Sequence, residues 1–168
     1  MKNIIIILSI ILLSFSVSCS KSKSSDSKFK IGILQLVEHA ALDEASQGFI
    51  DGLKEAGYED GKNLIIDYQN AQGEQANCIT IAQKFINDRS DLILAVATPA
   101  AQAVANLTKD IPILITAVTD PADAKLVADN NLPGGNVTGT SDLTPVKEQM
   151  DLLKRLIPNA KRVAFLYN

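Results

Sequence analysis

The sequence has almost none of the residues that build metal centres or nucleophilic catalytic sites. It holds one histidine, His39, two cysteines, Cys19 and Cys78, and no tryptophan. A single histidine without a cysteine cluster excludes a His-rich or cysteine-rich metal site. A Ser-His-Asp arrangement would have to use His39, and no nucleophile-elbow sequence accompanies it. We therefore expect a protein that is not an enzyme and that carries no cofactor or metal ion.

Glycine-rich phosphate-binding motifs and a basic stripe are also missing. No GxGxxG segment and no Walker-type Gly-Lys-Ser/Thr segment occurs, so nothing indicates a nucleotide site. The chain has 16 basic and 19 acidic side chains and a formal net charge of −3. A mildly acidic protein lacks the positive surface that attracts phosphate backbones, so we expect no nucleic-acid partner.

An apolar run near the start, at residues 4–17, follows Lys2. Its length is typical of a secretory signal, about 7–15 residues, and falls short of the ~20 residues that span a bilayer. Ser16-Val17-Ser18 then leads to Cys19, an order typical of bacterial lipoprotein signals. We expect residues 1–18 to be a signal peptide and Cys19 to be acylated; an ordinary cleaved signal with an incidental cysteine is the alternative. The remainder of residues 19–28 is Ser, Lys and Asp alone, which predicts a flexible tether.

Strands and helices alternate from residue 30 onward. Short aliphatic runs predict strands at residues 30–36, 64–68, 91–97, 112–118, 136–139 and 162–167. Apolar residues at helical spacing predict helices at 42–56, 74–87, 98–107, 121–128 and 146–156. Cys78 falls on the apolar stripe of the second helix and is interpreted as a buried structural thiol. The alternation predicts an α/β fold with a doubly wound, mostly parallel sheet.

Ligands of such sheets bind outside the edge where the carboxyl ends of the strands meet. The segment after the third strand is the most informative part of this edge, because Thr98 and Pro99 predict a capped helix N-terminus. Its free N–H groups and positive dipole end suit a carboxylate, and the small side chains of Ala100 and Ala101 let a ligand approach the backbone. A well-capped helix that binds nothing is the alternative.

Acidic residues follow the fourth and fifth strands at the same edge. Asp120 comes after Thr119, and Asp142 comes after Ser141. Either aspartate could pair with a ligand ammonium, and Asp120 could instead cap the next helix. A helix end that binds anions beside a free carboxylate would recognise the zwitterion of an amino acid. The expected edge comprises residues 35–39, 70–73, 98–102, 119–123 and 141–142. The full set of candidate ligand residues is Gln35, His39, Thr98, Ala100, Ala101, Thr119, Asp120, Ser141 and Asp142.

Short motifs in a fixed order connect the chain to a known family. They are Lys30-Ile31-Gly32-Ile33, Gln47-Gly48-Phe49, Gly57-Tyr58, Ala97-Thr98-Pro99-Ala100-Ala101-Gln102, Ala117-Val118-Thr119-Asp120-Pro121 and Pro133-Gly134-Gly135-Asn136-Val137-Thr138-Gly139. With this order and spacing, the chain resembles the N-terminal part of ABC transporter substrate-binding proteins of the TrpX-like type, which have the type I periplasmic-binding-protein fold. In that fold two α/β lobes close on a ligand.

The resemblance implies a domain division and a function. Residues 29–140 would form the first ligand-binding lobe, and residues 141–168 the hinge and the start of a second lobe that is largely absent. The protein would capture a small molecule for an ABC permease, and the expected ligand is an aromatic amino acid. It would be lipid-anchored to the extracytoplasmic face of the cell membrane. A binding protein that signals ligand to a membrane receptor is the alternative, and a secreted α/β hydrolase using His39 is a more remote one.

Overall fold

The computed structural model describes residues 28–164, so the expected signal peptide, the acylation of Cys19 and nearly all of the tether fall outside the described residues. The strands are β1 (Phe29–Gln35), β2 (Leu64–Asn70), β3 (Leu92–Val96), β4 (Ile113–Val118) and β5 (Val137–Ser141). The helices are α2 (Ala40–Glu55), α3 (Gln75–Asn87), α4 (Thr98–Leu107) and α5 (Val146–Leu156). No helix in the described part is long and apolar enough to cross a membrane.

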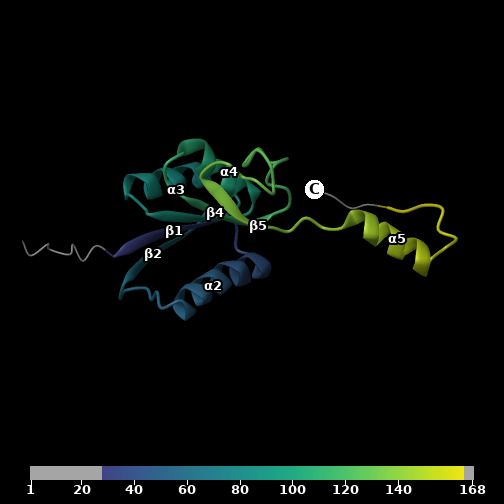
Figure 1. Ribbon diagram of the computed structural model, residues 1–168, viewed down its shortest axis with the longest axis horizontal. Coiled ribbons are helices and arrows are strands. Elements are labelled where there is room, and N and C mark those ends of the chain that lie inside the picture. The colour runs from purple at the N-terminus through teal and green to yellow at the C-terminus, as the bar shows by residue number, and fades with distance from the viewer. Residues whose placement is uncertain (1–27, 165–168) are drawn as a thin grey trace, which may run out of the picture.

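The strands form one parallel sheet in the order β2-β1-β3-β4-β5. Helix α2 covers one face, and α3 and α4 lie side by side on the other (Figure 1). The predicted doubly wound α/β fold is therefore confirmed. The strand order reverses between β1 and β3, which makes the loops after these two strands the expected mouth of a ligand crevice.

The core lies on both faces of the sheet because β1 and β3 are aliphatic on both sides. On the α2 side, Ile31, Ile33 and Val96 pack against Phe49 and neighbouring side chains of the helix. On the other side, fully buried Phe85 of α3 lies directly over Gly32 of β1. A β-carbon at position 32 would stand only 2.5 Å from the Phe85 ring, so the glycine makes room for the aromatic side chain.

Cys78 is fully buried on α3, as the sequence predicted, and it is a free thiol. Burial raises the pKa of its thiol, since a thiolate would lose its solvation there. The thiol therefore stays protonated and unreactive at neutral pH.

Two predicted elements are wrong over the residues that the structure describes. Residues 121–128 form hydrogen-bonded turns instead of a helix: Ala124 N–H donates to the Asp120 carbonyl, but Lys125 then adopts a φ of +59°. That left-handed conformation stops helix propagation after one turn. The strand expected at 162–167 is absent at 162–164, and residues 165–168 lie outside the described range.

Helix α5 is present as predicted, but it stands apart from the layered body (Figure 1). None of its residues is buried. Its apolar side chains include Val146 and Leu156, which are 54% and 71% exposed. The helix thus presents an amphipathic surface that the sheet β1–β5 and its helices do not cover.

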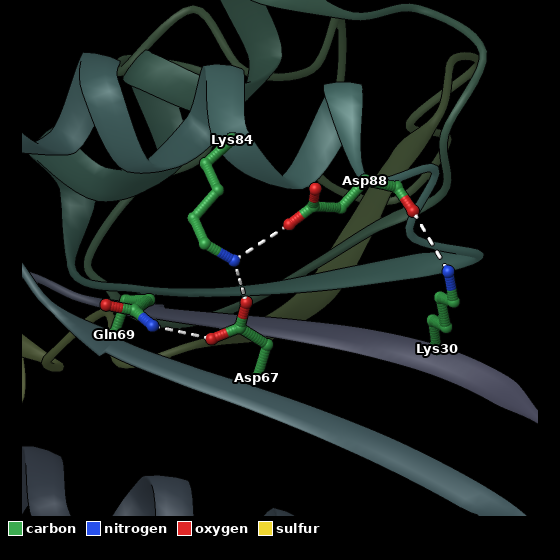
Figure 2. A network of polar contacts seen from close by, with 5 residues as sticks. All are labelled: Lys30, Asp67, Gln69, Lys84 and Asp88. Atoms are coloured by element: carbon green, nitrogen blue, oxygen red, sulfur yellow. Dashed lines mark hydrogen bonds and ion pairs between the residues drawn. The ribbon is translucent and has the colours of Figure 1, made fainter.

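A polar network ties the edge strand β2 to α3 (Figure 2). The Lys84 ammonium donates to Asp67 on β2 and, at 2.8 Å, to Asp88 on its own helix. Gln69 Nε2 donates to the second oxygen of Asp67 at 2.6 Å. Burial alone would raise the pKa of Asp67, but the bonds from Gln69 and Lys84 outweigh it and lower that pKa. The bond to Asp67, followed by that to Asp88, raises the pKa of Lys84.

We expect Lys84→Met to lower the free energy of unfolding by no more than about 1 kcal/mol, because the ammonium is half exposed and well screened. The loss should be constant across neutral pH: the contribution of Asp67 disappears only as pH falls through its lowered pKa, and that of Lys84 only as pH rises through its raised pKa. Urea unfolding at low and high salt checks this. Lys147→Met, which breaks a more exposed pair on α5, is the control and should change nothing. A salt-independent loss of several kcal/mol would contradict the assignment.

Candidate functional site

The carboxyl ends of the five strands are joined side by side by hydrogen bonds. Ala71 N–H donates to the Gln35 carbonyl at the end of β1. Leu36 N–H donates to the Val96 carbonyl at the end of β3, and Ala97 N–H donates to the Thr116 carbonyl of β4. Asp142 N–H donates to the Val118 carbonyl, and Ser141 Oγ donates to the Thr119 carbonyl at 2.6 Å. The segments that follow these strands therefore form a continuous border, which we call the carboxyl edge (residues 35–39, 70–73, 97–102, 119–123 and 141–142). All nine candidate ligand residues lie in it.

The helix N-terminus at this edge is built differently from the expected cap. Ala97, not Thr98, is the N-cap residue, and Thr98 is already helical and makes no side-chain capping bond. Pro99 has no N–H, and the Ala101 N–H donates to the Ala97 carbonyl at 3.0 Å. The amides of Thr98 and Ala100 are thus the ones that have no acceptor within the helix. Because these amides point out of the first turn of α4, the end still suits an anion.

Ala100 and Ala101 contribute to the edge through their backbone alone. Both side chains are completely buried in the core between α4 and the sheet. Their small size lets the helix sit close to β3 and β4, which in turn places its first amides at the ends of these strands. On the other side of the helix start, Gln102 Nε2 donates to the Ala124 carbonyl and ties α4 to the turn that follows Asp120.

Backbone strain is concentrated at the same place. Ala97, after β3, has φ +82° and ψ 153°, and Ala117, in β4, has φ +55°. Such conformations cost a residue other than glycine about 1–3 kcal/mol each. Ala117 lies in an irregular stretch of the β4–β5 ladder between Ile115 and Val118, where a β-carbon on Gly139 would collide with the Ile115 carbonyl oxygen. Strained residues persist where the surrounding structure imposes them, most often at ligand sites and switch regions.

Asp120 is held in one position by three hydrogen bonds to its Oδ1 atom. The donors are the N–H groups of Ala122 and Asp123 and the side-chain amide of Asn130, at 2.9–3.1 Å. These donors, the Asn130 amide first, lower the pKa of Asp120. It therefore caps the following turn, and its Oδ2 atom accepts no bond from the described part of the chain. The carboxylate is charged, fixed, and open on one oxygen.

The other candidates differ in how free their side chains are. Ser141 uses its hydroxyl twice, because it also accepts from the Leu143 N–H at 3.1 Å. Asp142 and Thr119 are exposed at the edge. His39 is exposed as well and caps α2, its Nδ1 accepting from the Ala41 N–H at 3.3 Å.

Gln35 is completely buried beneath the edge. Its Nε2 donates to the Val37 carbonyl at 2.9 Å and to Asp43 at 2.6 Å, and its Oε1 accepts from the Ser46 hydroxyl at 2.6 Å. Both donors of the amide are therefore used within the protein. The contacts position the loop after β1 against α2, and ligand contact by Gln35 stays a prediction.

Four residues that line a groove at the β1–β2 end of the carboxyl edge were expected at this edge but were not among the candidate ligand residues. Val37, Glu38, Asn70 and Gln72 surround about 350 Å³ of space there. Residues 35–39 and 70–73 were both expected at the edge, but nothing in the pattern of the chain indicates that residues 37 and 38 face residues 70–73. That pairing depends on β1 and β2 being neighbours in the sheet.

Three comparisons place the chain among known proteins. Residues 30–168 match the family described as ABC transporter substrate binding protein. A tyrosine-binding protein from Clostridioides difficile strain R20291 is 52% identical over 146 residues, which are 86% of this chain and 42% of that protein. The crystal structure of an ABC domain in complex with L-Trp from Streptococcus pneumoniae is 46% identical, with a TM-score of 0.73, and the match covers 79% of this chain and 45% of that one.

A more distant likeness shows the fold alone. A leucine-binding protein from Thermotoga maritima superposes with a TM-score of 0.56 at 14% identity, over 79% of this chain and 37% of that chain. The parallel sheet with helices on both faces is thus one lobe of the type I periplasmic-binding-protein fold. The chain spans about two fifths of the length of the tyrosine-binding relative. With a family match that covers most of its residues, this chain belongs to the ABC transporter substrate-binding proteins, a non-enzymatic family.

Proposed function

We propose that this chain forms the first lobe of an extracytoplasmic protein that captures an aromatic amino acid for an ABC-type importer. The observation that carries the proposal is the position of the α4 N-terminus next to Asp120. The free amides of Thr98 and Ala100 follow β3, and the fixed carboxylate follows the neighbouring strand β4. Adjacent strands lie about 4.8 Å apart, a separation that suits the carboxylate and ammonium groups of one α-amino acid.

The relatives support the class of ligand. One is a tyrosine-binding protein, and the structure of another holds L-Trp. The family match of this chain, residues 30–168, includes the whole carboxyl edge. A zwitterion that carries an aromatic side chain is the simplest ligand that fits both the edge and these relatives.

We further propose that residues 29–140 are the first lobe and that residues 141–168 are the hinge and the start of the second lobe. The chain leaves the sheet after Ser141 and enters α5, whose exposed apolar face suits packing within a second lobe. Closure of two lobes would bury the ligand and present the occupied form to an ABC permease. The lipid anchor at Cys19 and the placement on the outer face of the cell membrane are part of this proposal.

The recognition of a zwitterion is tested by removing one charged group of the ligand at a time. The protein for this test is the full-length form that would carry both lobes. In isothermal titration calorimetry with it, we expect saturable binding of L-tyrosine, L-tryptophan or L-phenylalanine. Tyramine, which lacks the carboxylate, and 3-(4-hydroxyphenyl)propionate, which lacks the ammonium, should each bind at least about 100-fold more weakly, because a desolvated charge at the edge is left unpaired. Equal affinities for tyrosine and these analogues, or no binding of any amino acid, would overturn the proposal.

A further inference from the structure

We propose that the groove lined by Val37, Glu38, Asn70 and Gln72, named here the side-chain groove, holds the side chain of the ligand and selects a phenol hydroxyl at its far end. This inference rests on the proposed function, because it takes the zwitterion as bound at α4 and Asp120. It assigns ligand specificity to residues that lie on the opposite side of β3 from Asp120.

The strand order sets the direction in which the side chain must run. With the carboxylate at the end of β3 and the ammonium toward β4, the side chain extends toward β1 and β2. The groove lies between the ends of β1 and β2, one and a half strand spacings from β3, or about 7 Å. That span is comparable with the length of an aromatic amino-acid side chain. The loop after β1 borders both places, since Leu36 N–H donates to the Val96 carbonyl of β3.

The walls of the groove are built before any ligand arrives. Gly73 N–H donates to the Leu36 carbonyl at 2.7 Å, which joins the loop after β2 to the loop after β1. Gln72 has a φ of +58° and donates its N–H to Asn70 Oδ1 at 2.8 Å. On the facing wall, the buried Gln35 amide holds the Val37 carbonyl at 2.9 Å. A rigid groove loses little conformational entropy when it is filled.

The lining suits an aromatic ring with a polar tip. Val37 is 37% exposed and offers its methyl groups to a ring face. The Glu38 carboxylate is an acceptor, and Asn70 keeps its Nδ2 as a donor because its Oδ1 is engaged by Gln72. A phenol hydroxyl can donate to the Glu38 carboxylate and accept from Asn70 Nδ2. An indole N–H can only donate, and a phenyl ring does neither. A phenyl ring would leave the carboxylate desolvated and unpaired, so we expect affinity to fall from tyrosine through tryptophan to phenylalanine.

The test compares two ligands that differ by one hydroxyl. In calorimetry on the protein with both lobes, Glu38→Ala should weaken L-tyrosine binding about tenfold and should not weaken L-phenylalanine binding, because the variant removes the carboxylate that a phenyl ring would leave unpaired. Glu44→Ala removes an exposed acidic side chain of α2 outside the groove and is the matched control. A second variant, Asn70→Asp, keeps the Oδ1 acceptor for Gln72 but removes the Nδ2 donor, and it too should lower the preference for tyrosine.

The possible results separate the two proposals. A tyrosine-to-phenylalanine ratio that collapses in both groove variants, and not in Glu44→Ala, supports the inference. Binding of both amino acids with an unchanged ratio overturns the groove assignment and leaves the zwitterion site intact. Failure of the unaltered protein to bind any amino acid overturns both proposals.

Discussion

Replacing Phe85 by alanine is expected to lower the free energy of unfolding by about 3–5 kcal/mol, the largest stability change that we predict for this lobe. The ring is fully buried between α3 and β1, where it lies close over the backbone of Gly32. Removing it opens a cavity over the central part of the sheet that no neighbouring side chain fills. Urea unfolding measures the change, and Phe29→Ala, which truncates a phenylalanine that is 43% exposed, is the control and should cost less than half as much.

A double-mutant cycle identifies the contact that is responsible. Gly32→Ala alone should cost about 1–3 kcal/mol, because the added methyl group would stand 2.5 Å from the Phe85 ring. In the Phe85→Ala background the same methyl group has room, so the cost should largely vanish. If Gly32→Ala is equally destabilising in both backgrounds, the close approach of ring and backbone is not what requires glycine at this position.

Replacing Asp120 by asparagine is expected to weaken amino-acid binding about 100-fold, the largest functional effect that we predict, because a desolvated ligand ammonium would lose its counter-charge. The substitution preserves Oδ1, so the bonds from Ala122 and Asp123 that cap the turn can still form. Calorimetric titration with tyrosine measures the loss. Asp123→Asn, an exposed aspartate in the same turn, should bind as the unaltered protein does. Should Asp142→Asn abolish binding instead, Asp142 would be the partner of the ammonium.

The pH dependence of binding follows from the same carboxylate. Because the Asn130 amide and the backbone donors lower the pKa of Asp120, the carboxylate stays charged in more acidic solution than an ordinary aspartate does. Affinity that depends on this charge is fully present above the ordinary aspartate pKa and is lost as pH falls through the lowered one. Asn130→Ala should raise the pKa of Asp120 and move the loss of binding to higher pH. An unchanged pH profile in this variant would contradict the role of Asn130.

Local sequence patterns were sufficient to predict the strands and helices in segments where burial of apolar side chains dominated. The aliphatic runs of β1, β3 and β4 predicted buried parallel strands, and the apolar stripes of α2 and α3 predicted helices that cover them. The prediction failed at residues 121–128 because Asp120 stabilises a tight turn there and Lys125 adopts a left-handed conformation. The same limit applies to Thr98, which was expected to cap the helix: Ala97 occupies the N-cap position, because the strained backbone at the end of β3 places the helix start one residue earlier.

The sequence by itself determined the α/β fold, the parallel sheet and the set of loops that share the carboxyl edge, because periodicity and the direction of parallel strands follow from local residue order. Only the tertiary structure decided which side chains of that edge are free. It shows Gln35 used inside the lobe, Asp120 fixed with one oxygen open, and the loop after β1 facing the loop after β2. These outcomes depend on which strands become neighbours and on hydrogen bonds between residues distant in the chain, and a pattern along one segment contains neither.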